Sequence, residues 1–359
     1  MTNNIFEPVT VGKLDLPHRL VMAPMTRSRA TAEGGLVTDL HAEYYGQRAA
    51  AGLIITEGTQ PSVRGQGYIQ TPGLHSDEQV AAWRKVTDRV HAEGGKIFAQ
   101  LMHAGRVGHP YLYPDGGLPE APSPVATGQA LYTNDQGMID HPVPRELTLD
   151  DIARVIGEFA DAARNAVAAG FDGVEVHGAN GYLIHQFLAD NTNLRTDAYG
   201  SGSVENRIRF AVEVTQAVVD AIGPERVGLR ISPDNEFNAG IKETGSLPTY
   251  LALIAQLNPL GLAYLHAFET DRAVTRELRR AWDGTLILNV ASDGIDPVAE
   301  AERILAGEVA DVVALGRPWL ANPDLTERIK AGAAYNEADP AAFYGGDHRG
   351  YTDYPVLDR

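Results

Sequence analysis

Short runs of apolar and β-branched residues recur along the chain, and each ends in a polar or glycine-containing turn, as expected for buried parallel strands. There are eight such runs, at residues 19–25, 52–57, 96–102, 173–177, 227–232, 262–266, 286–290 and 312–316. Between them, apolar residues recur every three to four positions, most clearly in residues 77–94, 151–170 and 204–223. Each of these three stretches ends at glycine, which readily adopts the left-handed conformation at a helix end. The pattern predicts strands that alternate with helices.

Eight strand-and-helix units in succession predict an α/β fold, a single (β/α)8 TIM barrel, because parallel strands joined by right-handed crossovers curve until the sheet closes. An open, doubly wound sheet is the rival, but no GxGxxG turn opens the series. Residues 1–359 are therefore expected to form one domain. Residues 104–147, rich in Gly and Pro, are predicted to cap the barrel mouth after the third strand, and residues 331–359 to form a C-terminal tail near it.

Composition narrows the possible functions. The chain of 359 residues has 30 Lys and Arg against 47 Asp and Glu, a net charge of −17 that repels nucleic acids and anionic bilayers. It contains no Cys, which excludes thiolate nucleophiles and Fe–S clusters, so a cofactor must supply any redox chemistry. No apolar run reaches the ~18 residues of a membrane span, and the N-terminus lacks a signal-peptide pattern. We expect a cytoplasmic protein, without a membrane or nucleic-acid partner.

Polar residues at the carboxyl ends of the strands are the first candidates for a site, because active sites of such barrels lie there. They are Thr26, Glu57, Gln100, His103, His177, Asn180, Arg230, His266, Asn289, Ser292 and Arg317. Buried strands hold such groups only where something satisfies them, so their clustering at one end indicates a polar ligand. Each of them taken alone is equally compatible with a helix cap or a loop contact.

Two strand ends suggest a cofactor with a phosphate. Gly316 and Arg317 follow the last strand, and residues 291–294 follow the strand before it. Barrels usually bind phosphate at this position, through backbone N–H groups and, here, a guanidinium. The alternative for Arg317 is an ion pair on the surface. Arg230 lies in an otherwise apolar strand and needs an accepting partner. That partner is either a cofactor ring that becomes negative on reduction, or a buried ion pair with Glu57 or Glu175.

The turn after the fourth strand suggests catalysis. His177 and Asn180 supply two neutral donors that can polarise a carbonyl or nitro oxygen, and Tyr182 can supply a proton. Metal-dependent hydrolysis is the second enzymatic hypothesis, with His103, His177 and His266 as ligands, although the chain has no HxH pair or strand-eight aspartate. Schiff-base chemistry is disfavoured, since no lysine falls at a strand end. The third hypothesis, a non-catalytic carrier of a cofactor or ligand, is disfavoured because a carrier would not require His177, Asn180 and Tyr182 in one turn.

Longer motifs resemble one family. The segments MAPMTRSRA, EYYGQRAAAGLIITEGT, QLMHAGR, AGFDGVEVHGANGYLIHQFL, SVENRIRF, VGLRISP, ALGRPWLANPDL and FYGGDHRGYTDYP are similar to those of the old yellow enzyme family, from about Ile5 to Pro355. The resemblance implies an ene-reductase that holds FMN non-covalently and takes hydride from NADPH or NADH. By a ping-pong mechanism it would reduce activated C=C bonds of α,β-unsaturated carbonyl or nitro compounds. The expected assembly is a monomer or a homodimer.

The resemblance also implies a role for each site residue. FMN would be bound by Pro24, Met25, Thr26, Gly58, Gln100, Arg230, Ala291, Ser292, Gly294, Gly316 and Arg317. The catalytic residues would be His177 and Asn180, which bind the substrate oxygen, and Tyr182, which donates a proton to the α carbon. The substrate pocket would be lined by Tyr68, Met102, His177, Asn180 and Tyr344, and no metal is expected.

Three positions depart from the family pattern. Met102 stands where many relatives have Trp, and its smaller, flexible side chain is expected to alter the pocket. Ser201 is an extra residue in a loop that leads into a helix, where insertions are usually tolerated. The strand-seven loop, NVASDG, lacks the double glycine of some relatives, which affects the phosphate contacts expected there.

Overall fold

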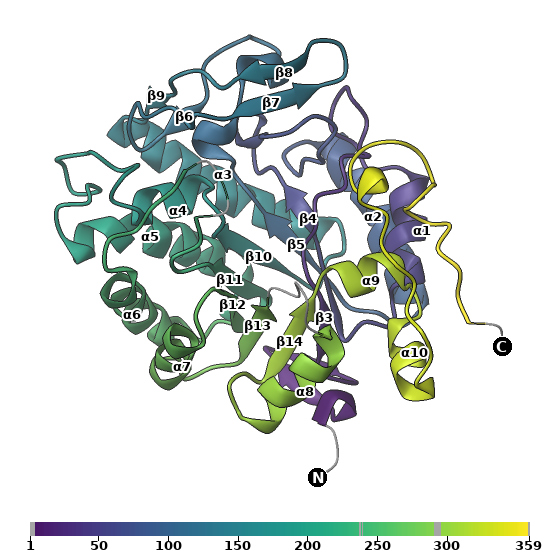
Figure 1. The fold of residues 1–359 in the computed structure, drawn as a ribbon. Coiled ribbons are helices and arrows are strands. Elements are labelled where there is room, and N and C mark those ends of the chain that lie inside the picture. The colour runs from purple at the N-terminus through teal and green to yellow at the C-terminus, as the bar shows by residue number, and fades with distance from the viewer. Residues whose placement is uncertain (1–3, 237, 239, 291–295, 358–359) are drawn as a thin grey trace.

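The computed structural model describes residues 4–236, 238, 240–290 and 296–357. Its centre is a closed barrel of eight parallel strands (Figure 1). In barrel order they are β3 (Leu20–Met22), β4 (Leu53–Thr59), β5 (Ile97–Leu101), β10 (Gly173–Gly178), β11 (Val227–Ile231), β12 (Tyr264–Glu269), β13 (Leu286–Val290) and β14 (Val312–Leu315). Each strand overlaps one of the eight predicted apolar runs, although β12 ends three residues later than predicted, and the predicted TIM barrel is confirmed.

Helices surround the barrel (Figure 1). The longer ones are α1 (Asp39–Gln47), α2 (Asp77–Ala92), α3 (Leu149–Ala168), α5 (Val204–Ile222), α6 (Ser246–Leu257), α7 (Arg272–Ala281) and α8 (Pro297–Ala306). Helices α2, α3 and α5 are the three predicted from periodicity, and the glycines that follow them, Gly94, Gly170 and Gly223, have φ of +79°, +91° and +88°. Shorter helices are α4 (Leu183–Leu188), α9 (Arg317–Ala321) and α10 (Leu325–Ala331).

The strands bury both faces, and two apolar clusters result. Side chains that point outward, such as Ile54 and Leu229, pack against the helices in one large cluster. Alternate side chains point inward and fill the amino-terminal part of the barrel; among them are Val21, Leu53, Phe98, Ile287 and Val312. Side chains of a hairpin of β1 (Val9–Val11) and β2 (Leu14–Leu16) join this inner cluster. The inner cluster is therefore a packed core rather than a channel.

Residues 104–147 contain short strands that the sequence pattern did not predict. β6 (Glu120–Ala121) pairs with β9 (Arg145–Glu146), and β7 (Ala130–Thr133) forms an antiparallel hairpin with β8 (Gly137–Asp140). In Figure 1 this hairpin lies at one end of the molecule, and the N-terminal hairpin lies at the other. The excursion therefore stands over the end of the barrel at which the strands finish.

Two arginines anchor the C-terminal tail beside the same end. Arg27 donates from Nε to the carbonyl of Phe343 at 2.9 Å and from Nη2 to that of Gly350 at 2.8 Å. Arg29 donates from Nε to the carbonyl of Asp347 at 2.9 Å. Both arginines are buried and follow β3 closely, so the tail is tied to the segment that leaves the first barrel strand. Among the described helices, none combines the length and the apolar character needed to cross a bilayer.

Candidate active site

A cavity of about 890 Å³ opens at the carboxyl ends of the strands. Its walls come from the segment after β3, the loop after β4, the β7–β8 hairpin, the turn after β10, helix α9 and the C-terminal tail. Seven of the predicted site residues lie on these walls: Pro24, Met25, Thr26, Tyr68, Tyr182, Arg317 and Tyr344. Segments that are far apart in the sequence thus meet around one space of the size that ligand sites usually have.

Inside the barrel, the inward positions change from apolar to polar toward this same end. The polar ones, which we call the polar layer, are Gln100, Glu175, His177, Arg230, His266 and Asn289, each at most 8% exposed. Register places Glu175 beside Gln100, and His177 beside Arg230 and then His266. Glu175 was not predicted as a site residue. The signal was in the sequence, since Glu175 is two residues before His177 in one strand and therefore points to the same side.

Arg230 is held within the polar layer without a salt bridge. Its Nη2 donates to Asn289 Oδ1 at 2.8 Å, and Asn289 Nδ2 donates to the carbonyl of Ala314 at 3.0 Å. Among the described residues, no ion pair within 4.0 Å is found for Arg230, and its Nε is buried without a hydrogen-bond partner. The ion pair with Glu57 or Glu175 that was the alternative is therefore not formed. A buried guanidinium with an unused donor fits an accepting ligand.

His177 carries a second unused polar atom. Its Nδ1 is buried without a partner among the described residues. Burial, and after it the positive charge of Arg230, hold the pKa of His177 well below its usual value. The imidazole is therefore neutral and can donate one N–H, which suits the binding of an oxygen that gains negative charge.

Asn180 occupies the turn after β10 in a left-handed conformation, with φ of +54°. Asparagine tolerates this conformation better than most residues. Its backbone N–H donates to Ser232 Oγ at 2.8 Å, and its Oδ1 accepts from Asn235 Nδ2 at 3.0 Å. Because the amide oxygen is engaged by Asn235, the group that Asn180 can offer to a ligand is its NH₂, a donor.

Tyr182 and Tyr68 form a pair of hydroxyls on the cavity wall. Their oxygens are 2.9 Å apart, and Asn238 Nδ2 donates to Tyr68 Oη at 3.3 Å. The His177 ring lies edge-on to the Tyr182 ring at 5.1 Å between centroids. Burial raises the pKa of Tyr182 well above its usual value, so the phenol keeps its proton. A protonated phenol beside a neutral imidazole is a suitable proton donor.

Glycines at two predicted positions leave room for methionine side chains. A Cβ on Gly58 would lie 2.6 Å from Met102 Sδ, and a Cβ on Gly316 would lie 3.4 Å from Met25 Sδ. Met102 is buried against Gly58 behind the cavity rather than on its wall. Gly316 precedes Arg317, the first residue of α9.

Four residues singled out in the sequence analysis lie either away from the cavity or outside the residues that the structure describes. Ala291, Ser292 and Gly294 lie outside the described residues. The extra residue Ser201 offers its carbonyl to Arg207 Nη2 at 3.0 Å in the loop before α5.

Two strand-end candidates are structural rather than part of the polar layer. His103 Nδ1 accepts from the backbone N–H of Gly105 at 3.1 Å, and burial lowers its pKa to about 4. Glu57 accepts from the backbone N–H of Arg27 at 3.2 Å and from Tyr45 Oη at 3.4 Å, and burial raises its pKa to about 7. Both side chains hold loops at the barrel end, and His103 Nε2 is buried without a hydrogen-bond partner among the described residues.

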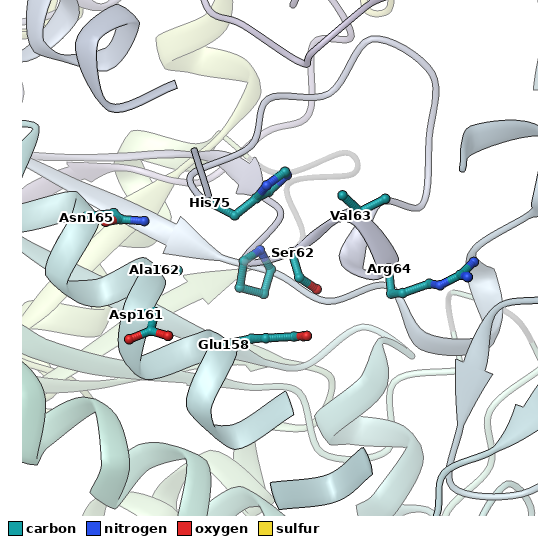
Figure 2. Close-up of a pocket in the computed structure, with 9 residues that line it drawn as sticks. Ser62, Val63, Arg64, His75, Glu158, Asp161, Ala162 and Asn165 are labelled. Carbon is teal, nitrogen blue, oxygen red and sulfur yellow. The ribbon is translucent and has the colours of Figure 1, made fainter. Parts of the chain in front are cut away.

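A second cavity, of about 360 Å³, lies outside the barrel between the loop after β4 and helix α3 (Figure 2). Figure 2 shows Glu158 on α3 below Ser62, with Asp161 further to the left on the same helix, His75 above and Arg64 directed away. Its charged groups pair with neighbours: Arg64 with Asp115, and Glu158 with Arg154 at 2.6 Å. None of the predicted site residues lines this cavity.

The residues of the first cavity fit a flavin. Arg230 Nε and His177 Nδ1 are buried polar atoms that need partners, and they lie at the same barrel end as the cavity. Gln100 adds a buried amide in the same layer, and Pro24, Met25 and Thr26 supply a wall. Within the described part of the chain, no three His, Asp or Glu side chains form a metal-binding group, so the metal-dependent hypothesis gains no support.

Comparisons with known proteins agree with this site. Residues 4–336 match the model of the NADH:flavin oxidoreductase / NADH oxidase family. The chain is 41% identical to rice 12-oxophytodienoate reductase 1 over 99% of its length and 93% of that protein. It is 42% identical to a probable flavin mononucleotide-dependent alkene reductase of Leishmania infantum, over 98% of this chain and 97% of that protein.

Solved structures show the same likeness. Morphinone reductase superposes with a TM-score of 0.94 at 44% identity, over 99% of this chain and 97% of that chain, and one of its structures is a complex with tetrahydroNAD. The old yellow enzyme homologue of Zymomonas mobilis superposes with a TM-score of 0.93 at 39% identity, over 99% and 100%. The chain belongs to the NADH:flavin oxidoreductase / NADH oxidase family, that of old yellow enzyme, and is an FMN-dependent oxidoreductase that reduces activated alkenes with hydride from NAD(P)H.

Proposed function

We propose that the activated alkene binds in the 890 Å³ cavity and that Tyr182 protonates its α carbon. The observation that carries the proposal is the position of Tyr182: its hydroxyl lies on the cavity wall, 2.9 Å from that of Tyr68 and beside the neutral ring of His177. Bound FMN supplies the hydride, which it takes from NAD(P)H. Tyr68 can donate to the Tyr182 oxygen, which leaves the proton of Tyr182 free to point to the substrate.

His177 and Asn180 are proposed to bind the electron-withdrawing oxygen of the substrate. One offers an imidazole N–H and the other an amide NH₂ whose orientation Asn235 supports. Both donors are neutral, so they stabilise negative charge that develops on the oxygen more than they stabilise the uncharged carbonyl. The same two donors could bind the oxygen of a nitro group, and we propose nitro compounds as a second class of hydride acceptor.

The cofactor contacts are proposed residue by residue. Pro24, Met25 and Thr26 would lie against the ring of FMN, and Gln100 and Arg230 would bond to its pyrimidine edge. Gly58 would contact the ring next to Met102, and Gly316 and Arg317 would hold the phosphate. Ala291, Ser292 and Gly294 complete the phosphate site in this proposal, on the strength of the family resemblance alone.

The outer part of the cavity is proposed to select the body of the substrate. Residues 104–147 would act as the cap of a single-domain protein, residues 331–359 as the tail that closes the mouth from the other side. Their contributions include Leu131, Tyr132, Phe343 and Tyr344. These apolar and aromatic groups favour neutral substrates with an apolar body, in line with relatives named for 12-oxophytodienoate and morphinone. A cytoplasmic location is proposed from the sequence analysis alone.

Tyr182→Phe tests the proton-donor role. We expect the variant to reoxidise with 2-cyclohexenone about 100-fold more slowly or worse, because it lacks the proton of a general acid. Reduction by NADPH should proceed at the wild-type rate. The two half-reactions are followed separately by anaerobic stopped-flow absorbance.

Tyr199→Phe is the matched control, since Tyr199 does not line the cavity and its hydroxyl donates to Glu213 on α5 at 2.7 Å. It should leave both half-reactions unchanged. If Tyr182→Phe slowed both half-reactions equally, or neither, Tyr182 would not be the proton donor.

A further inference from the structure

Glu175 is a fully buried carboxylate at the centre of the polar layer. Its Oε1 accepts from Gln100 Nε2 at 2.7 Å, and its Oε2 lies 2.8 Å from His266 Nδ1. Both of its oxygens are thus engaged by protein side chains, and it does not line the 890 Å³ cavity. A buried carboxylate costs stability unless its surroundings compensate it, which makes its presence beside two proposed FMN-binding residues informative.

The hydrogen bond between Gln100 and Glu175 fixes the orientation of the Gln100 side-chain amide. A carboxylate can only accept, so the group that Gln100 presents to Glu175 must be its NH₂. The carbonyl oxygen of Gln100 is then the group that remains for a ligand. Its backbone N–H is also held, by Thr56 Oγ1 at 3.1 Å, so the residue has little freedom to turn. Gln100 is thereby prepared to accept a hydrogen bond from a ring N–H.

The charge of Glu175 also opposes that of Arg230. Burial lowers the pKa of His177 and of His266, so both rings are neutral. Although burial raises the pKa of Glu175, hydrogen bonds from His266 and Gln100 and the positive charge of Arg230 lower it overall, so it stays ionised. The formal charge of the polar layer is therefore one positive guanidinium and one negative carboxylate. These two charges sum to zero.

We propose that Glu175 is a positioning residue for the flavin, because it orients the Gln100 amide toward the pyrimidine edge of the ring. Its negative charge also balances the positive charge of Arg230 and so keeps the reduction potential of the flavin lower. This inference rests on the proposed function of Gln100 and Arg230 as FMN-binding residues. Reduction adds negative charge to the ring, and an uncompensated Arg230 would favour that charge more strongly than the wild-type pair does.

Glu175→Gln removes the charge and keeps the shape. We expect a more positive two-electron reduction potential, measured on the holoenzyme by anaerobic titration against a reference dye. Since a Gln can donate as well as accept, the Gln100 amide also loses its fixed orientation. FMN affinity should therefore fall about tenfold, as for the loss of one hydrogen bond to a charged group. The dissociation constant is measured by fluorescence titration of the apoprotein with FMN.

Two further variants separate charge from position. Glu175→Asp keeps the charge but withdraws the oxygens from Gln100 and His266, so affinity should fall about tenfold while the potential stays at the wild-type value. Asp220→Asn removes an exposed carboxylate from α5 and should change neither quantity.

Wild-type potential and affinity in Glu175→Gln would overturn the proposal. If Glu175→Gln gave no folded holoenzyme, wild-type affinity in Glu175→Asp would overturn the positioning role. Wild-type protein that bound no FMN would instead refute the proposed function itself.

Discussion

The two halves of the barrel interior have opposite chemistry. At the amino-terminal half, inward side chains such as Leu53, Phe98 and Ile287 are apolar and fully buried. At the carboxyl half, Gln100 and Asn289 point inward two residues after Phe98 and Ile287 on β5 and β13, and Arg230 joins them from β11. One period-2 pattern thus builds a core at one end and a site at the other.

This difference indicates that the apolar half of the barrel interior stabilises the fold and that the polar half does not. Burying an apolar side chain stabilises the fold by roughly 1.5–3 kcal/mol, whereas buried ionised groups seldom return their desolvation cost. The polar layer is therefore hard to explain as a stabilising device. It is explained if bound ligands use polar atoms that protein groups leave unpaired, among them Arg230 Nε for the cofactor and the His177 ring for the substrate.

Phe98→Ala should show the largest effect on stability. Phe98 is fully buried in the apolar half, with its ring 5.8 Å from that of Tyr264, and its loss leaves a cavity. We expect the free energy of unfolding to fall by about 4 kcal/mol in urea titrations, with FMN affinity of the folded protein unchanged. A loss of under about 1 kcal/mol would mean that the apolar half does not support the fold as described.

A pair of glycine variants compares the two halves directly. At Gly228, in the apolar half, a new Cβ would lie 2.2 Å from the Tyr264 ring; at Gly58 it would lie 2.6 Å from the flexible Met102 side chain. Because an aromatic ring cannot yield as a methionine can, Gly228→Ala should destabilise by about 3 kcal/mol and Gly58→Ala by about 1 kcal/mol. Thermal unfolding of both proteins at one pH tests the order, and the reverse order would contradict it.

His103→Gln addresses a polar residue at the carboxyl end that lies outside the polar layer. Its pKa is about 4 in the folded protein against about 6.5 when unfolded, so the unfolded state binds more protons between these values. Its contribution is fully present above pH 6.5 and is lost as the pH falls toward 4. Relative to His103→Gln, wild type should lose about 2 kcal/mol of stability from pH 7 to pH 5.

The measurement is urea unfolding of both proteins at the two pH values. Turnover at pH 7 should be equal in the two proteins. A pH-independent difference in stability would show that His103 does not titrate as stated.

The barrel was predictable from the sequence because its signal is local: each strand is an apolar run, and each helix has its own period. The position of the site was predictable for the same reason, since strand ends can be counted. What could not be predicted depends on contacts distant in sequence, such as the Tyr68–Tyr182 bond and the anchoring of the tail by Arg27 and Arg29. The β7–β8 hairpin was missed because its strands are only four residues long.

Glu175 illustrates a different limit. Its alternation with His177 placed it inside the barrel, but an acidic residue there reads equally as an ion-pair partner for Arg230. Only the structure shows that its oxygens face Gln100 and His266 instead.

The central claim is that the carboxyl half of the barrel interior is built around FMN that passes hydride from NAD(P)H to an alkene. The most direct test is the visible absorption spectrum of the purified protein, followed without oxygen as NADPH and then 2-cyclohexenone are added. We predict flavin bands that bleach with NADPH and return with the enone. Protein that stays colourless after FMN is supplied, or bands that the enone does not restore, would contradict the account.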